Sequence, residues 1–344
     1  MKPLHSLSPL DRVALPDGSD PMALSLNENP FPPLPSVQAA MARAARAANR
    51  YPEFLPVELR AVIADHLGVA HERIVIGAGA TGVIMQALRA LTSPGDRIVL
   101  PYPTFDGYPI FAQIASLVCV PVPLDDDGHH DLDAMAEAAV GARVVVLCRP
   151  HNPTGTLESE AKLRRFLMRL SRDTVVLLDE AYIEFVEPRH RIDITKLIDD
   201  FPNVFAVRTF SKAYGLAGIR TGYGCCAPHI ARTLWTMQLP FGSTVTSLAA
   251  VIASYRSVRQ LDQRIRAVVD ERGYLHARLR ALGVGCTESH ANYLYVPDGL
   301  ASPERMYAET GVRVRGYAGG GVRITIGTRQ SSHAVLSALA SGVA

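Results

Sequence analysis

Between residues 74 and 207, short apolar runs rich in β-branched residues alternate with stretches that have the periodicity of helices. The runs cover residues 74–76, 98–100, 117–122, 144–147, 175–178 and 204–207. Strands that are apolar on both sides are buried on both faces, so this alternation predicts an α/β fold with a mostly parallel sheet sandwiched by helices. Ligands bind such sheets at the carboxyl ends of the strands. Several polar motifs directly follow the runs, and we therefore expect the functional site there.

The chain divides into three predicted regions: an N-terminal arm (1–35), a large domain (36–235) and a smaller α+β C-terminal domain (236–344). The arm is expected to be irregular because four prolines between residues 30 and 35 interrupt any periodicity. The large domain begins with a predicted helix over 37–48. In the small domain, a helical stretch over 248–282, in one or two pieces, precedes strand patterns at 293–296 and 322–326.

The composition is that of an ordinary globular protein, with 48% hydrophobic and 20% charged residues. A net charge of +2 gives no reason to expect nucleic acid or an acidic membrane as a partner. The chain has no apolar run of membrane-spanning length and no leader pattern over residues 1–15. The five cysteines form no CxxC pair and most lie in apolar runs, so we expect reduced thiols, a cytoplasmic protein and no metal site.

The segment RTFSKAYGLAGIR, residues 208–220, places Lys212 just after the apolar run 204–207. Thr209 and Ser211 supply hydroxyls beside the lysine, and Arg220 follows eight positions later. A lysine at a strand end can form a Schiff base with the aldehyde of pyridoxal 5'-phosphate, while hydroxyls and a guanidinium hold the phosphate. The alternative is an ordinary solvated lysine, which the neighbouring anion-binding groups disfavour.

Two further motifs follow neighbouring apolar runs. Asn152 lies in the Asn-Pro-Thr-Gly segment after run 144–147, and Asp179 follows run 175–178. Each alone could be a turn or a helix cap. A carboxylate at a strand end can also keep a bound pyridine nitrogen protonated, which makes the ring an electron sink. Because the motifs all suit one cofactor, coincidence is the weaker interpretation.

Residues 77–82, GAGATG, match the GxGxxG pattern of dinucleotide-binding proteins. That pattern also needs an acid at the end of the next strand to hold the ribose. The available acid, Asp96, precedes the run 98–100, so it lies at the wrong end of that strand. A nicotinamide-dependent oxidoreductase is therefore disfavoured. A single phosphate at the start of the following helix remains compatible with the pattern.

Taken together, these motifs resemble the fold type I pyridoxal phosphate aminotransferases, in particular the histidinol-phosphate and aromatic aminotransferase group. The matching segments are NENP (27–30), HNPTG (151–155), DEAY (179–182), SKAYGLAGIR (211–220) and RITIGT (323–328). They span almost the whole chain.

The resemblance implies a role for each cofactor-binding residue. Lys212 is the Schiff-base lysine and proton shuttle, and Asp179 pairs with the ring nitrogen. Tyr182 and Asn152 hydrogen-bond the phenolic oxygen of the ring, and Phe105 stacks on it. The phosphate is held by Ala80, Thr81, Ser211 and Arg220.

The resemblance also implies a homodimer, in which Tyr51 reaches the cofactor phosphate of the neighbouring subunit. Arg323 holds the substrate carboxylate with Asn152 beside it, and Arg315 adds a second positive charge. The reaction is a ping-pong transfer between an amino donor and a 2-oxo acid acceptor.

Four departures from the group leave the amino donor open. Residues 79–82 lack the usual acidic pair, Phe105 lacks a tyrosine hydroxyl, and the arm segment 7–16 lacks a tyrosine. Arg149 replaces a frequent asparagine and is expected to add positive charge near the pocket. Histidinol phosphate, an aromatic amino acid and a donor of specialised metabolism all remain candidates. Decarboxylation or oxidation at the same cofactor, and a catalytically silent binding protein, remain as alternatives.

Overall fold

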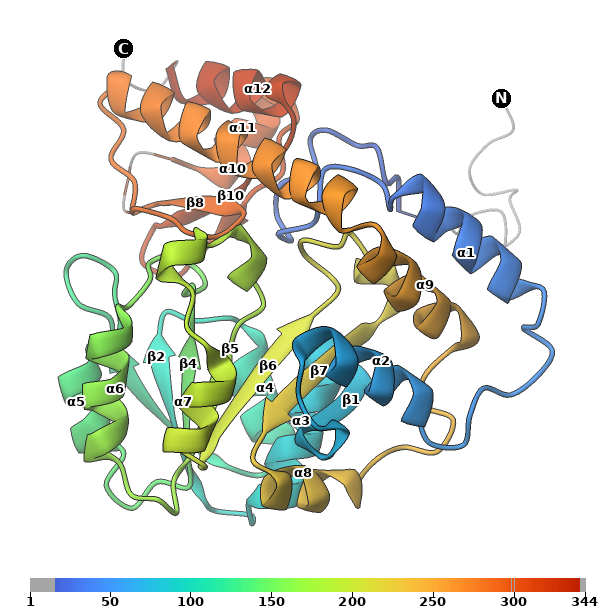
Figure 1. Ribbon diagram of the computed structural model, residues 1–344. Coiled ribbons are helices and arrows are strands. Elements are labelled where there is room, and N and C mark those ends of the chain that lie inside the picture. Colours follow the sequence, from blue (N-terminus) through green and yellow to red (C-terminus); the bar gives the residue numbers. More distant parts are fainter. Residues whose placement is uncertain (1–15, 298, 300, 341–344) are drawn as a thin grey trace, which may run out of the picture.

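The computed structural model describes residues 16–297, 299 and 301–340, and its centre is a seven-stranded sheet. Figure 1 shows this sheet below the smaller one. The strands lie in the order β1-β7-β6-β5-β4-β2-β3. Their bounds are β1 Ile74–Ala78, β2 Arg97–Tyr102, β3 Val118–Pro123, β4 Val144–Cys148, β5 Val175–Asp179, β6 Val204–Thr209 and β7 Thr221–Cys226. Only β7 runs antiparallel to its neighbours, so the prediction of a mostly parallel sheet is confirmed.

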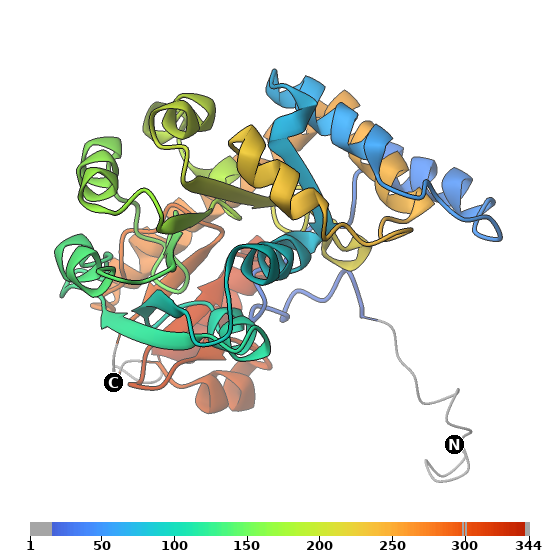
Figure 2. The same cartoon turned by 90° about the horizontal axis from the view of Figure 1, so that it is seen from below.

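Helices cover both faces of this sheet, as the view from below shows (Figure 2). One face packs against α2 (Val57–Leu67), α5 (Leu132–Ala138), α6 (Glu160–Arg169), α7 (Ile194–Asp200) and α9 (Val245–Arg256). The other face packs against α3 (Gly79–Leu91), α4 (Gly107–Ile114) and α8 (Pro228–Trp235). Successive residues of a strand point to opposite faces, so Val145 and Leu147 enter the first core while Val144 and Val146 enter the second.

Strand β7 is absent from the sequence-based prediction. Its sequence, TGYGCC, has no β-branched run, and its two glycines are required by close packing. A Cβ at Gly222 would lie 2.4 Å from the backbone nitrogen of Ala80, and one at Gly224 would lie 2.3 Å from the Phe205 ring. The glycines that allow this strand to pack in the sheet are therefore also the reason that it lacks the hydrophobic pattern of a strand.

A second, three-stranded antiparallel sheet has the order β8-β10-β9. Its strands are β8 Tyr293–Val296, β9 Arg315–Gly316 and β10 Val322–Thr325, accompanied by α10 (Val258–Ala281), α11 (Pro303–Thr310) and α12 (Arg329–Ala340). The predicted long helix is interrupted at Ser257, between α9 and α10. Arg323 lies on β10, the central strand of this sheet.

The arm is tied to the small sheet. From residue 16 to the start of α1 (Pro35–Ala45), it forms no helix and no strand beyond an isolated bridge between Ala23 and Arg313. Leu24 is buried in the core beneath the small sheet, and its carbonyl accepts a 3.0 Å hydrogen bond from the Thr325 amide. The predicted domain boundaries stay a prediction. Most of segment 7–16, noted above for its missing tyrosine, lies outside the described residues.

None of the described helices is long and apolar enough to cross a membrane.

Candidate active site

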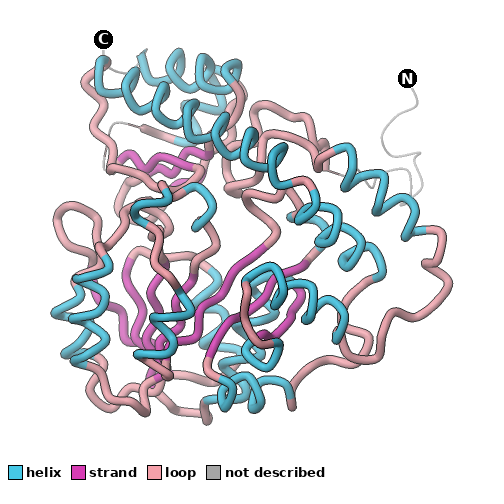
Figure 3. The backbone as a smooth tube through the Cα atoms, viewed as in Figure 1, coloured by secondary structure: helices cyan, strands magenta, loops and turns pink. Residues whose placement is uncertain are grey.

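A cavity of about 250 Å³ lies at the carboxyl ends of the central strands. The strand ends form the edge of the large sheet that faces the small sheet (Figure 3). Nine of the twelve predicted site residues line the cavity: Ala80, Thr81, Phe105, Asn152, Asp179, Tyr182, Ser211, Lys212 and Arg220. They come from the segments that end or follow β1, β2, β4, β5 and β6. Strands that run in one direction end at one edge, so motifs far apart in the sequence meet in this cavity.

Lys212 follows β6 and is partly buried in the cavity wall. Its Nζ donates a 2.8 Å hydrogen bond to the carbonyl oxygen of Leu26 in the arm. Burial, with a further contribution from Arg323, lowers the pKa of Lys212 to about 8. The ordinary value is 10.5, so a much larger fraction of this amine is neutral and nucleophilic near neutral pH.

Asp179 ends β5 and is 5% exposed. Its Oδ2 accepts a 2.5 Å hydrogen bond from the Tyr108 hydroxyl, and its Oδ1 accepts one of 2.9 Å from the Ala181 amide. Burial raises the pKa of this carboxyl, and the two hydrogen bonds oppose the shift. Among the described residues, no lysine, arginine or histidine forms an ion pair with it. The carboxylate therefore suits a ligand that brings its own positive charge.

Tyr182 lines the cavity, and its hydroxyl is held by two side-chain amides. Its oxygen accepts hydrogen bonds from Nδ2 of Asn27, at 3.0 Å, and from Nδ2 of Asn152, at 3.4 Å. The orientation of the Asn152 amide follows from Arg323, which can only donate and does so to Asn152 Oδ1 at 2.5 Å. With both acceptor positions of the phenol used, its proton is left for a ligand in the cavity.

The start of α3 has the chemistry of an anion site. Helix α3 has no side-chain cap, Ala80 and Thr81 of its first turn line the cavity, and the N-terminus of a helix favours an anion. Arg220 lies across from them and donates a weak 3.4 Å hydrogen bond to Ser211 Oγ. Gly79 has φ +73°, and a Cβ there would lie 2.3 Å from Arg220 Nη2. Only glycine lets the guanidinium approach the helix start this closely.

Arg323 lies behind Asn152 and is 6% exposed. Besides Asn152, its guanidinium donates to the Tyr317 hydroxyl at 3.0 Å and to the Ser25 carbonyl at 2.7 Å. Its Nε is buried without a partner, and among the described residues no carboxylate pairs with it. A buried guanidinium without a counterion suits a carboxylate ligand.

Three predicted residues do not line the cavity: Tyr51, Arg315 and Arg323. Tyr51 is 82% exposed, with its ring centroid 4.7 Å from that of Phe241. Arg315 is half exposed and paired with Asp106 at 2.7 Å. The Arg149 guanidinium is buried, donates to the carbonyls of Glu158 and His190, both at 2.9 Å, and does not line the cavity.

Residues absent from the sequence-based prediction complete the site. The Tyr108 hydroxyl donates a hydrogen bond to Asp179, and the Asn27 amide donates one to Tyr182. The Tyr317 hydroxyl accepts one from Arg323. Asn27 lies in the NENP segment that marked the resemblance, so a signal for it existed. Tyr108 lies on α4 three residues after Phe105, and this spacing gives no signal that its partner is Asp179.

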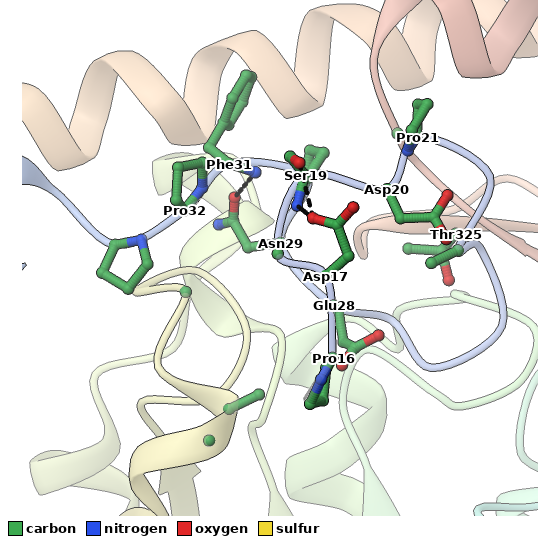
Figure 4. A pocket seen from close by; sticks show the side chains of 18 of the residues that line it. Pro16, Asp17, Ser19, Asp20, Pro21, Glu28, Asn29, Phe31, Pro32 and Thr325 are labelled. Carbon is green, nitrogen blue, oxygen red and sulfur yellow. Dashed lines mark hydrogen bonds between the residues drawn. The ribbon is translucent and has the colours of Figure 1, made fainter. Parts of the chain in front are cut away.

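A second cavity, of about 430 Å³, lies between the arm, the loop after Lys212 and the start of α12. Figure 4 shows arm side chains such as Asp17, Glu28 and Asn29 around it. It shares Glu28, Ser211 and Ala217 with the first cavity. The two cavities are therefore neighbours, and the arm forms a wall of both.

Comparison with known proteins agrees with this geometry. The family described as "Aminotransferase class I and II" matches residues 19–339. The chain is 38% identical to an "Aromatic amino acid aminotransferase" of Cutibacterium acnes, covering 97% of this chain and 96% of that protein. It is 42% identical to a protein of the same name from Rhodococcus jostii, covering 91% and 88%. A crystal structure of histidinol-phosphate aminotransferase from Sinorhizobium meliloti in complex with pyridoxal-5'-phosphate superposes with a TM-score of 0.88, at 26% identity, over 99% and 98% of the two chains.

Proposed function

Because this chain belongs to the class I and II aminotransferase family, we propose that it moves the amino group of an aromatic amino acid to a 2-oxo acid, using pyridoxal 5'-phosphate. The observation that carries the proposal is the single cavity shared by Lys212, Asp179, Tyr182 and Arg220. The curated relatives at 38% and 42% identity support an aromatic donor. The structural neighbour that contains pyridoxal-5'-phosphate supports the cofactor.

The donor groups of the cavity fit this cofactor from end to end. The α3 amides, Ser211 and Arg220 would hold the phosphate, and Phe105 would pack on the ring. The uncompensated Asp179 carboxylate would keep the ring nitrogen protonated, and the Tyr182 proton would serve the ring oxygen. When bound, the cofactor supplies an aldehyde that combines covalently with an amine and a ring that accepts an electron pair.

The protein's own side chains then orient the donor and move its proton. Arg323 binds the carboxylate of the amino donor, and Asn152 is held beside it by a 2.5 Å hydrogen bond. Lys212 Nζ removes the proton from Cα of the donor, and its lowered pKa increases the fraction of the amine that is neutral and can accept this proton. The same residues then serve the 2-oxo acid in the second half of the reaction.

The proposed enzyme is a homodimer. Tyr51, Phe54, Val57, Leu239 and Phe241 expose between 43% and 82% of their surface. The ring of Phe241 lies 4.7 Å from that of Tyr51 and 5.1 Å from that of Phe54, so the aromatic members form one patch. Large exposed apolar patches mark interaction sites on protein surfaces. A second copy of the chain would cover this patch and bring Tyr51 towards its neighbour's cofactor.

The five free cysteines support a cytoplasmic location.

Purified holoprotein mixed with phenylalanine and 2-oxoglutarate tests the activity. We expect one equivalent of phenylpyruvate and one of glutamate for each phenylalanine consumed. Release of carbon dioxide or hydrogen peroxide without glutamate would replace transamination by decarboxylation or oxidation. Turnover of histidinol phosphate but not of phenylalanine would reject the aromatic donor.

A further inference from the structure

Arg315 and Arg323 lie on the same face of the small sheet. They are directly opposite each other in the antiparallel pairing of β9 with β10, so their side chains project to one side. Arg323 reaches Asn152, and Arg315 reaches Asp106. Asn152 and Asp106 both belong to loops at the edge of the large sheet where the cavity lies. The face of the small sheet that covers the active site therefore carries two arginines.

The two arginines differ in their counterions. Arg323 has no carboxylate partner among the described residues, as stated above. Arg315 Nη2 donates a 2.7 Å hydrogen bond to Asp106 Oδ2, in an ion pair whose two side chains are both about half exposed. Asp106 is the N-cap residue of α4, yet its side chain makes no capping hydrogen bond. Its carboxylate is thus committed to Arg315 and not to the helix.

The pair also lies next to the groups that meet the substrate. Asp106 directly follows Phe105, which lines the cavity. The Arg315 guanidinium lies 6.0 Å from the ring centroid of Tyr317, whose hydroxyl accepts from Arg323. The charges of Asp106 and Arg315 act on the pKa of Tyr317 in opposite directions, which places both within electrostatic reach of it.

We propose that Asp106 is a specificity-determining residue: it occupies Arg315 and thereby selects against amino donors that carry a second anionic group. The inference rests on the proposed function. A donor whose carboxylate lies at Arg323 presents any distal anion to the same face, where Arg315 is the available cation. A distal phosphate or carboxylate would have to displace Asp106 and leave that carboxylate unpaired beside it. A neutral aromatic side chain meets no such repulsion.

The test compares wild type with Asp106→Asn, a change that removes the charge and disturbs no helix cap. Donors are phenylalanine, glutamate and aspartate, of which the last two carry a second carboxylate. We expect kcat/KM for the two acidic donors to rise about fivefold to tenfold, while the value for phenylalanine stays within about twofold. The gain disappears in Asp106→Asn combined with Arg315→Gln, and it shrinks with added salt. As a matched control, Asp133→Asn removes the partner of Arg169 in another surface ion pair and changes no ratio.

The effect of Asp106 on binding can be measured without turnover. Isothermal titration calorimetry gives the dissociation constants of glutarate and butyrate for the same holoproteins. Asp106→Asn is expected to tighten glutarate relative to butyrate by a similar factor. Unchanged ratios in both turnover and binding would overturn the inference. If wild type fails to use phenylalanine but the glutarate-to-butyrate ratio still shifts, the proposed aromatic function falls and the role of Asp106 stands.

Discussion

Tyr108 donates a 2.5 Å hydrogen bond from its hydroxyl to Oδ2 of Asp179, joining the start of α4 to the end of β5. Both residues are buried, at 1% and 5% exposure. Burial and the charge of Asp179 raise the pKa of the phenol, so it remains a donor. The hydrogen bond in turn opposes the rise that burial imposes on the pKa of Asp179. Tyr108 therefore helps to keep a buried carboxylate ionised where the proposed cofactor needs it.

Replacing Tyr108 with Phe removes this hydrogen bond at almost constant volume. Because the bond lowers the pKa of Asp179, its loss raises that pKa further, and the acidic limb of the kcat–pH profile moves to higher pH. A lost hydrogen bond to a charged group costs about 1.5–3 kcal/mol, so we expect a fall in kcat of about tenfold or more at acidic pH. Fluorescence titration should also show weaker binding of pyridoxal phosphate to the apoprotein. Tyr307→Phe, at a tyrosine that is 58% exposed, is the control. A profile that superposes on that of wild type would remove Tyr108 from this role.

Lys212 provides a pH dependence that can be measured before any substrate is added. Its pKa is lowered to about 8, so the neutral amine that attacks an aldehyde predominates above that pH. The rate at which apoprotein and pyridoxal phosphate develop visible absorbance should rise with pH, with a midpoint of about 8. Arg323 contributes to the lowering, so Arg323→Gln should move the midpoint upwards. A midpoint close to 10.5 would contradict the burial argument.

Arg323→Lys tests whether the substrate carboxylate is bound by a guanidinium. The arginine donates at once to Asn152, Tyr317 and Ser25, and a lysine ammonium cannot reproduce that planar fork. We expect kcat/KM for phenylalanine to fall about 100-fold, which corresponds to about 2.7 kcal/mol, mainly through KM. Arg329→Lys keeps a surface ion pair with Glu271 and should leave kcat/KM within about twofold. Equal losses in both variants would point to a general effect on stability.

The residues that were predicted from the sequence share one physical property. Asn152, Asp179 and Lys212 each follow a continuously apolar strand, and parallel strands bring their ends to one edge. The hydrophobic pattern therefore reports both the sheet and the place of the site. It misses β7, because Gly222 and Gly224 are chosen for close backbone approach and not for apolar surface.

The supporting side chains could not be predicted in the same way. Asn27 and Tyr182 are 155 positions apart, and Tyr108 and Asp179 are 71 apart. Such contacts depend on how the arm and helix α4 lie on the sheet, and no periodicity encodes that placement. The ion pair of Arg315 with Asp106 is of the same kind, since the two residues are 209 positions apart. The resemblance implied that Arg315 adds a positive charge to the site, but no signal in the sequence indicated that Asp106 is its counterion.

Mixing a variant that lacks Lys212 with one that lacks Tyr51 tests whether Tyr51 acts across a dimer. Tyr51 is 82% exposed and does not line its own cavity, so the proposed dimer makes it a ligand of the neighbouring subunit's cofactor. Lys212→Ala should abolish turnover while leaving the fold intact, and Tyr51→Ala should weaken retention of pyridoxal phosphate. In a mixed dimer, one of the two sites combines an intact Lys212 with an intact Tyr51 from its partner. After subunit exchange, we therefore expect activity to appear at up to about a quarter of the wild-type level, since about half of the dimers are mixed and each has one complete site. Sedimentation velocity should first show that both variants are dimers. If mixed dimers form but the mixture is no more active than its components assayed separately, Tyr51 does not act in trans.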